Sequence, residues 1–88
     1  MSAHAPTREH LALLVERATD GGIRAAEIVD SDESLAALGV SSLSLLRLAD
    51  GLESEYGVLI DLGDRALYAE GLAGLTARVR RLAEEGAP

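Results

Sequence analysis

The chain has 88 residues, enough for one small domain with a modest core but too few to enclose an enzyme active site. Apolar residues make up 48% of the sequence and are nearly all Leu, Ala, Val and Ile, which favours packed helices over a twisted sheet. The formal net charge of -7 disfavours binding to nucleic acid and favours basic surfaces on protein partners.

Nothing in the sequence indicates export or membrane insertion. The first residues lack the charged and then apolar pattern of a signal peptide, and the longest apolar run, Leu11 to Val15, is too short to span a bilayer. The absence of cysteine excludes disulfides and thiolate metal sites, and is ordinary for a reducing compartment. We therefore expect a monomeric cytoplasmic protein that binds neither membranes nor nucleic acid.

The first predicted element is an amphipathic helix that Thr7 caps and that continues to about Thr19, before Gly21-Gly22. From residue 23 to residue 39 the pattern weakens into a long loop, and loops of this length are usually functional or partly helical. Its apolar residues are expected to anchor it to the core. These anchors are Ile28, Leu35 and Leu38.

The acidic part of this loop, Asp30–Ser34, has the opening pattern of a calcium-binding loop. However, the sixth position is Leu35 instead of glycine, and the twelfth is Ser41 instead of glutamate. We interpret the segment as a solvated acidic loop. His4 and His10 have no partner motif and are interpreted as surface residues, so no metal site is predicted.

The strongest helix prediction starts at Ser41 or Ser42, continues to about Tyr56 and stops at Gly57. Its residues Leu45, Leu48, Ala49, Leu52 and Tyr56 share one face. The next three residues, 58–60, are expected to form a buried extended connector, because a lone three-residue strand has no partner.

A short helix is predicted near Asp64 to Tyr68, and a final helix is marked by Leu72, Leu75, Val79 and Leu82. The expected fold is all-α, a four-helix bundle of three main helices and one short one. We expect residues 1–88 to form a single domain, with its packed part at about residues 7–84.

The segment with the most specific pattern is Leu38–Leu43, where a glycine-containing turn places serines at the start of the long helix. The simplest interpretation is an N-cap, since serine is a favoured cap residue. A helix start also offers unpaired N–H groups and a positive dipole end, which would suit a phosphodiester on a serine hydroxyl. The two roles are compatible. A hydrolase nucleophile elbow is disfavoured, because Leu43 replaces its second glycine and no sheet is predicted.

Three blocks at matching intervals resemble the acyl and peptidyl carrier proteins. Leu38–Leu43 (LGVSSL) resembles the family's Leu-Gly-x-Asp/His-Ser-Leu turn, Tyr56–Ile60 (YGVLI) its helix exit, and Leu67–Leu75 (LYAEGLAGL) the entry to its last helix. The resemblance implies a non-enzymatic carrier with 4'-phosphopantetheine on Ser42, which holds cargo as a thioester. The implied partners are a phosphopantetheinyl transferase, acyl- or aminoacyl-loading enzymes and downstream synthases.

Three positions depart from the family pattern. Ser41 replaces the Asp or His that usually precedes the modified serine, Arg47 replaces the Glu of fatty-acid-type carriers, and Asp61 replaces a proline. Arg47 is similar to the Arg of many peptidyl carriers, so the departures favour polyketide or nonribosomal peptide biosynthesis, with both options open. Ser41 is also the main argument for the alternative, a carrier-like interaction domain that is no longer modified.

The expected chain is a free-standing carrier whose partner contacts lie on the helix that follows Ser42. Two exposed leucines beside the attachment site and the charged positions further along are the candidates, although the charges are equally compatible with an ordinary solvated face. The predicted partner contacts are Leu43, Leu46, Arg47, Asp50, Glu53 and Glu55.

Overall fold

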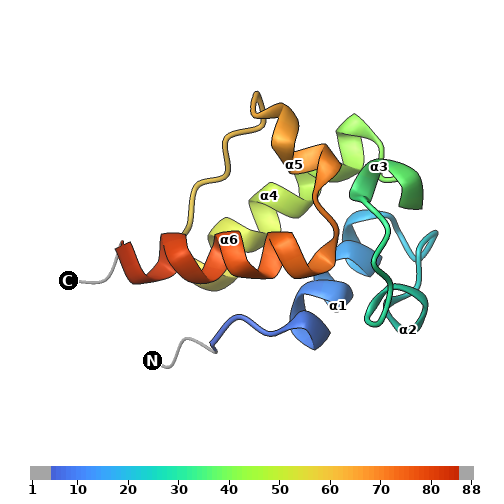
Figure 1. The fold of residues 1–88 in the computed structure, drawn as a ribbon, viewed down its shortest axis with the longest axis horizontal. Helices are drawn as coiled ribbons and strands as arrows, with labels where there is room; N and C mark the ends of the chain where they lie inside the picture. Colours follow the sequence, from blue (N-terminus) through green and yellow to red (C-terminus); the bar gives the residue numbers. More distant parts are fainter. Residues whose placement is uncertain (1–4, 86–88) are drawn as a thin grey trace.

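The computed structural model describes residues 5–85, and within this range it contains six helices and no strand beyond one isolated bridge between Ser34 and Gly71 (Figure 1). Three helices are long and three are short. They are α1 (Arg8–Ala18), α2 (Ala25–Ile28), α3 (Leu35–Leu38), α4 (Ser42–Tyr56), α5 (Arg65–Ala69) and α6 (Leu72–Glu85). The all-helical prediction with three main helices is confirmed.

The ends of the first two main helices lie where their caps predict them. The Thr7 side chain accepts a hydrogen bond from the His10 backbone N–H at 3.1 Å, and α1 ends before Thr19. Ser41 caps α4 in the same way, and Gly57 follows its last residue in the left-handed conformation. The sequence therefore defines both helices to within a residue at each end.

The segment 23–39, expected as a loop with anchors, contains the additional short helices α2 and α3. Each forms one turn around a buried anchor, Ile28 in α2 and Leu35 in α3. Ser34 caps α3 by accepting a hydrogen bond from the Ala37 N–H at 3.1 Å. A single turn is too short to show helical periodicity in the sequence, so only the anchors were visible there.

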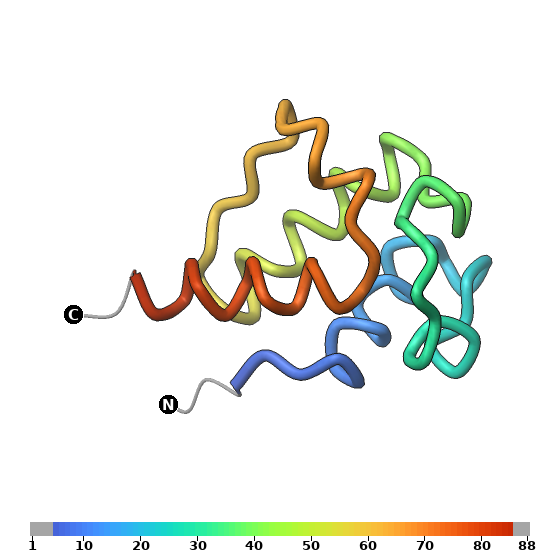
Figure 2. Tube along the Cα trace, viewed as in Figure 1, coloured from blue at the N-terminus to red at the C-terminus, as the bar shows by residue number. Residues whose placement is uncertain are grey.

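The three main helices form the core of the molecule. α1 packs against both α4 and α6, α4 also contacts α6, and α3 contacts α5 (Figures 1 and 2). The core is aliphatic. Its members are Leu11, Ala12, Leu14, Val15, Ala18, Ile28, Leu35, Val40, Leu45, Leu48, Leu52, Val58, Leu67, Leu72, Leu75 and Val79.

The connector between α4 and α5 is extended and only partly buried. Val58 is 3% exposed and Ile60 is half-buried, but Leu59 is 74% exposed. The expectation of a buried connector is therefore wrong for Leu59. Successive side chains of an extended segment point to opposite sides, so one residue of the three turns outward.

Both ends of α5 are fastened to α6 by Arg78. Its guanidinium hydrogen-bonds both carboxylate oxygens of Glu70, at the C-terminal end of α5, and reaches the N-cap Asp64 at 3.2 Å. The hydrogen bond to Glu70 is the main cause that raises the pKa of Arg78, so this residue remains charged. The clamp fixes a helix of only five residues that could not be stable alone.

The junction between α5 and α6 also receives the acidic loop. The Leu35 N–H donates to the Glu70 carbonyl at 2.8 Å, and the Glu33 carbonyl lies 2.6 Å from where a Cβ on Gly71 would be. Only glycine allows this approach without displacing the backbone.

Among residues 5–85, no helix is long and apolar enough to cross a membrane.

Candidate functional site

The turn that leads into α4 is defined by three successive residues. Gly39 ends α3 with φ +91°, a conformation that favours glycine. Val40 is 5% exposed and anchors the turn in the core, after which Ser41 caps α4. The buried Val40 and the Ser41 cap thus hold the start of α4, and this fixes the position of Ser42.

Three serines lie at this helix start, and their hydroxyls have different surroundings. The Ser41 oxygen accepts from the Ser44 N–H and its hydroxyl contacts the Ser44 hydroxyl, both at 3.1 Å. Ser42 is the first residue of α4, and its side chain is exposed. Its Oγ accepts a hydrogen bond from the Tyr68 hydroxyl of α5 at 3.2 Å.

This arrangement fits a phosphodiester on Ser42. The hydroxyl is reachable from solvent, lies at the positive end of a 15-residue helix, and has a phenolic donor beside it. Ser41 is committed to capping, so a group attached there would remove the cap. Among the three serines, the geometry favours Ser42.

Four of the predicted contact residues lie on one side of α4. Leu43 and Leu46 are 58% and 53% exposed, as expected for residues outside the core stripe. Further along, Asp50 and Glu53 are exposed, and together with Leu46 they line a groove of about 210 Å³.

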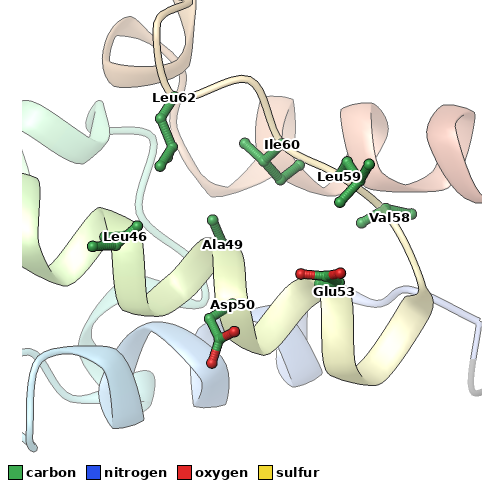
Figure 3. A pocket seen from close by; sticks show the side chains of 8 residues that line it. All are labelled: Leu46, Ala49, Asp50, Glu53, Val58, Leu59, Ile60 and Leu62. Carbon is green, nitrogen blue, oxygen red and sulfur yellow. The ribbon is translucent and has the colours of Figure 1, made fainter.

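The opposite wall of this groove is the connector between α4 and α5. Figure 3 shows Ile60 and Leu62 of the connector across from Leu46 and Ala49 of α4. Apolar side chains therefore contribute to both walls of the groove, and Asp50 and Glu53 of α4 also line it. We refer to the exposed side of α4 formed by Leu43, Leu46, Asp50 and Glu53 as the groove flank.

The other two predicted contacts, Arg47 and Glu55, lie on the side of α4 that borders α1. Arg47 forms an ion pair with Asp20 at 2.8 Å, and Glu55 hydrogen-bonds His10 at 2.8 Å. Both line a separate hollow between α1 and α4. Both side chains thus have a partner within the chain, which the sequence pattern did not reveal.

At the C-terminal end of α4, Tyr56 packs against His10 of α1. The Tyr56 ring meets His10 edge-on with a centroid distance of 5.7 Å, and its buried hydroxyl has no partner among the described residues. Burial, followed by the nearby Glu55 charge, raises the pKa of Tyr56. His10 is half-buried and paired with Glu55, so its prediction as a simple surface residue is incomplete; His4 lies outside the described residues.

Tyr68 is the site residue that sequence reasoning missed as a contact of Ser42. In the sequence it stands inside the LYAEGLAGL block, whose family resemblance does not pair it with Ser42. The two residues are 26 positions apart, and nothing in a single sequence pairs them.

Among residues 5–85, no cluster of three or more metal-ligating side chains is present.

Comparison with known protein families gives a match over residues 15–79 to the family described as the phosphopantetheine attachment site. The matched segment includes the three serines at the start of α4, the rest of that helix, the connector and α5. Comparisons with curated proteins and with solved structures gave no significant match.

Proposed function

The chain belongs to the phosphopantetheine attachment site family, and from this premise we propose that it is an acyl or peptidyl carrier whose prosthetic arm is attached to Ser42. Members of this family are non-catalytic carriers with 4'-phosphopantetheine covalently bound to a serine. The protein is therefore a carrier and not an enzyme. Its partners include a phosphopantetheinyl transferase and, in general terms, the synthase enzymes that use the arm.

One observation supports Ser42 above its neighbours. Its hydroxyl is exposed at the first position of α4, whereas the Ser41 oxygen is used as the cap of that helix. Ser44 is half-buried, and its hydroxyl contacts Ser41. Of the three serines, only Ser42 combines an exposed side chain with a hydroxyl that takes no part in the helix cap.

The test of this function is attachment itself. We expect the purified protein, incubated with coenzyme A and a permissive phosphopantetheinyl transferase, to gain the mass of one phosphopantetheine group. Intact-protein mass spectrometry measures the gain, and peptide mapping locates it. A protein that stays unmodified under conditions that modify a known carrier would favour the alternative, a carrier-like interaction domain that has lost the modification.

We place the carrier in polyketide or nonribosomal peptide biosynthesis. The support is Arg47, which occupies a position that is acidic in fatty-acid-type carriers, and Asp61 in place of the family's proline. The Arg47 side chain is 49% exposed despite its pair with Asp20, so part of its charge still faces solvent. We further propose that residues 1–88 form one carrier domain, supported by the single core cluster of the described residues.

We propose that partner enzymes bind the groove flank. It combines two exposed leucines with two carboxylates that have no intrachain ion pair among residues 5–85. An exposed apolar centre with a charged edge is typical of a protein interface. Arg47 and Glu55 remain candidates of second rank, because substitution of either also removes an intrachain pair.

We expect Glu53→Lys to slow transfer of phosphopantetheine to the protein roughly two- to tenfold at low ionic strength, because acidic residues on the carrier steer basic partner surfaces. The difference from wild type should shrink with added salt, since the Debye length falls to about 10 Å at 0.1 M. The measurement is the second-order rate constant of modification at several salt concentrations.

Glu33→Lys is the matched control for this variant. Glu33 is also an exposed glutamate, but it lies in the loop between α2 and α3, away from α4 in sequence and on another element. Both variants change the net charge equally. A rate loss of the same size in the two variants would mean that overall charge, and not the groove flank, governs the encounter.

A further inference from the structure

The contact between Tyr68 and Ser42 joins two elements at the attachment site. The phenolic hydroxyl of α5 donates to the Ser42 Oγ of α4 at 3.2 Å. The Tyr68 ring is partly buried and packs against the core, so its hydroxyl is held at the surface by a fixed ring. The Tyr68 hydroxyl is thus a hydrogen-bond donor whose position is set by the packing of its ring.

The helix that carries Tyr68 is itself fixed. Arg78 binds the N-cap Asp64 and the C-terminal Glu70, and this carboxylate pair brackets Tyr68 on both sides. Arg78 is only 16% exposed, so water screens these contacts less than it screens a surface pair. The contacts of Arg78 with Asp64 and Glu70 therefore hold α5 in the position from which the Tyr68 hydroxyl reaches Ser42.

Modification changes what this donor can bind. In the unmodified protein the acceptor is a neutral serine oxygen. Once that oxygen is esterified it becomes a poor acceptor, while the adjoining phosphoryl oxygens carry negative charge and accept strongly. A hydroxyl within hydrogen-bond reach of Ser42 Oγ lies next to the bond that the phosphorus atom would form.

We propose that Tyr68 is a positioning residue that donates its hydroxyl hydrogen bond to the phosphodiester of the modified protein and holds the base of the prosthetic arm against α5. This inference rests on the proposed attachment at Ser42. It assigns α5 a role in directing the arm, since the arm then leaves the protein between α4 and α5 instead of swinging freely around the helix start.

The experiment compares the modified forms of the wild type, Tyr68→Phe and Tyr56→Phe. The readout is the ³¹P NMR resonance of the single phosphodiester. Tyr56→Phe is the matched control, because it removes the other phenolic hydroxyl of the chain, which is buried and has no partner among the described residues. We expect the wild type and Tyr56→Phe to share one chemical shift, displaced from that of the urea-unfolded modified protein.

In Tyr68→Phe the resonance should move most of the way to the unfolded position, with a narrower line as the arm gains freedom. An unchanged resonance in this variant would overturn the inference. Phe keeps the ring and its packing, so folding should be preserved. If the variant does not fold, ¹³Cζ-labelled tyrosine in the wild type provides the test: modification should shift the Tyr68 signal and leave Tyr56 unchanged, and no shift at Tyr68 overturns the inference.

Mass spectrometry separates this inference from the proposed function. A wild type that gains no mass, or whose modified peptide maps to Ser41 or Ser44, overturns both. If the protein is modified on Ser42 but its ³¹P chemical shift is the same in Tyr68→Phe as in the wild type, only the role of Tyr68 is overturned. The carrier function then stands.

Discussion

Replacement of Ser42 by alanine should abolish attachment of phosphopantetheine completely, because the substitution removes the only oxygen that can form the phosphodiester at this position. The fold should survive, since Ser42 is exposed and Ser41 still caps the helix. Intact mass after treatment with coenzyme A and transferase is the measurement. A mass gain that persists in Ser42→Ala would contradict the assignment.

Ser44→Ala and Ser41→Ala are the matched controls, and both should still be modified. Ser44→Ala removes a hydroxyl that contacts Ser41, whereas Ser41→Ala removes the N-cap of α4 and should cost about 0.5 to 2 kcal/mol of stability. Modification of Ser41→Ala is therefore measured well below its unfolding temperature, so that partial unfolding is not mistaken for loss of the acceptor.

Ser41→Asp tests whether the missing acidic residue matters. Asp caps helices about as well as Ser, so this variant adds a carboxylate while it preserves the structural role of the position. Faster modification than wild type would show that the transferase reads that charge. If the wild type gains no mass and Ser41→Asp does, the natural domain is no longer modified. The alternative function, a carrier-like interaction domain, is then the better one.

The main helices were predictable because each has strong local signals. α1 and α4 combine a side-chain cap with several turns of apolar periodicity, and Gly57 marks the end of α4. The short helices α2 and α3 depend instead on tertiary anchors such as Ile28 and Leu35, which a single turn cannot display as a period. Long-range packing decides these elements.

The site was predictable only where it is continuous in sequence. Ser42 stands in a local motif, whereas its contact with Tyr68 spans 26 positions and depends on where Arg78 holds α5. The ion pair of Arg47 with Asp20 and the hydrogen bond of Glu55 with His10 also depend on the position of α1. For this reason the sequence identified the contact residues as one set, and the structure divides them into two flanks.

Leu52→Ala should destabilise the protein by roughly 2 to 5 kcal/mol, the usual range for a buried leucine. Leu52 is 1% exposed and belongs to the buried stripe of α4 with Leu45 and Leu48. The total free energy of unfolding of a domain of this size is about 5 to 10 kcal/mol, so the loss is a large share of its stability. Urea unfolding followed by circular dichroism measures it.

Leu46→Ala is the control, since it makes the same chemical change on the same helix at a side chain that is 53% exposed. It should alter stability by no more than about 0.5 kcal/mol. If Leu52→Ala also stays below that limit, then α4 does not pack through this stripe. In that case α4 would be rotated about its axis relative to the rest of the protein. The exposure of Ser42 and the groove flank would then have to be reassigned, because the buried stripe, the exposed Ser42 and the groove flank all depend on the same rotation of α4.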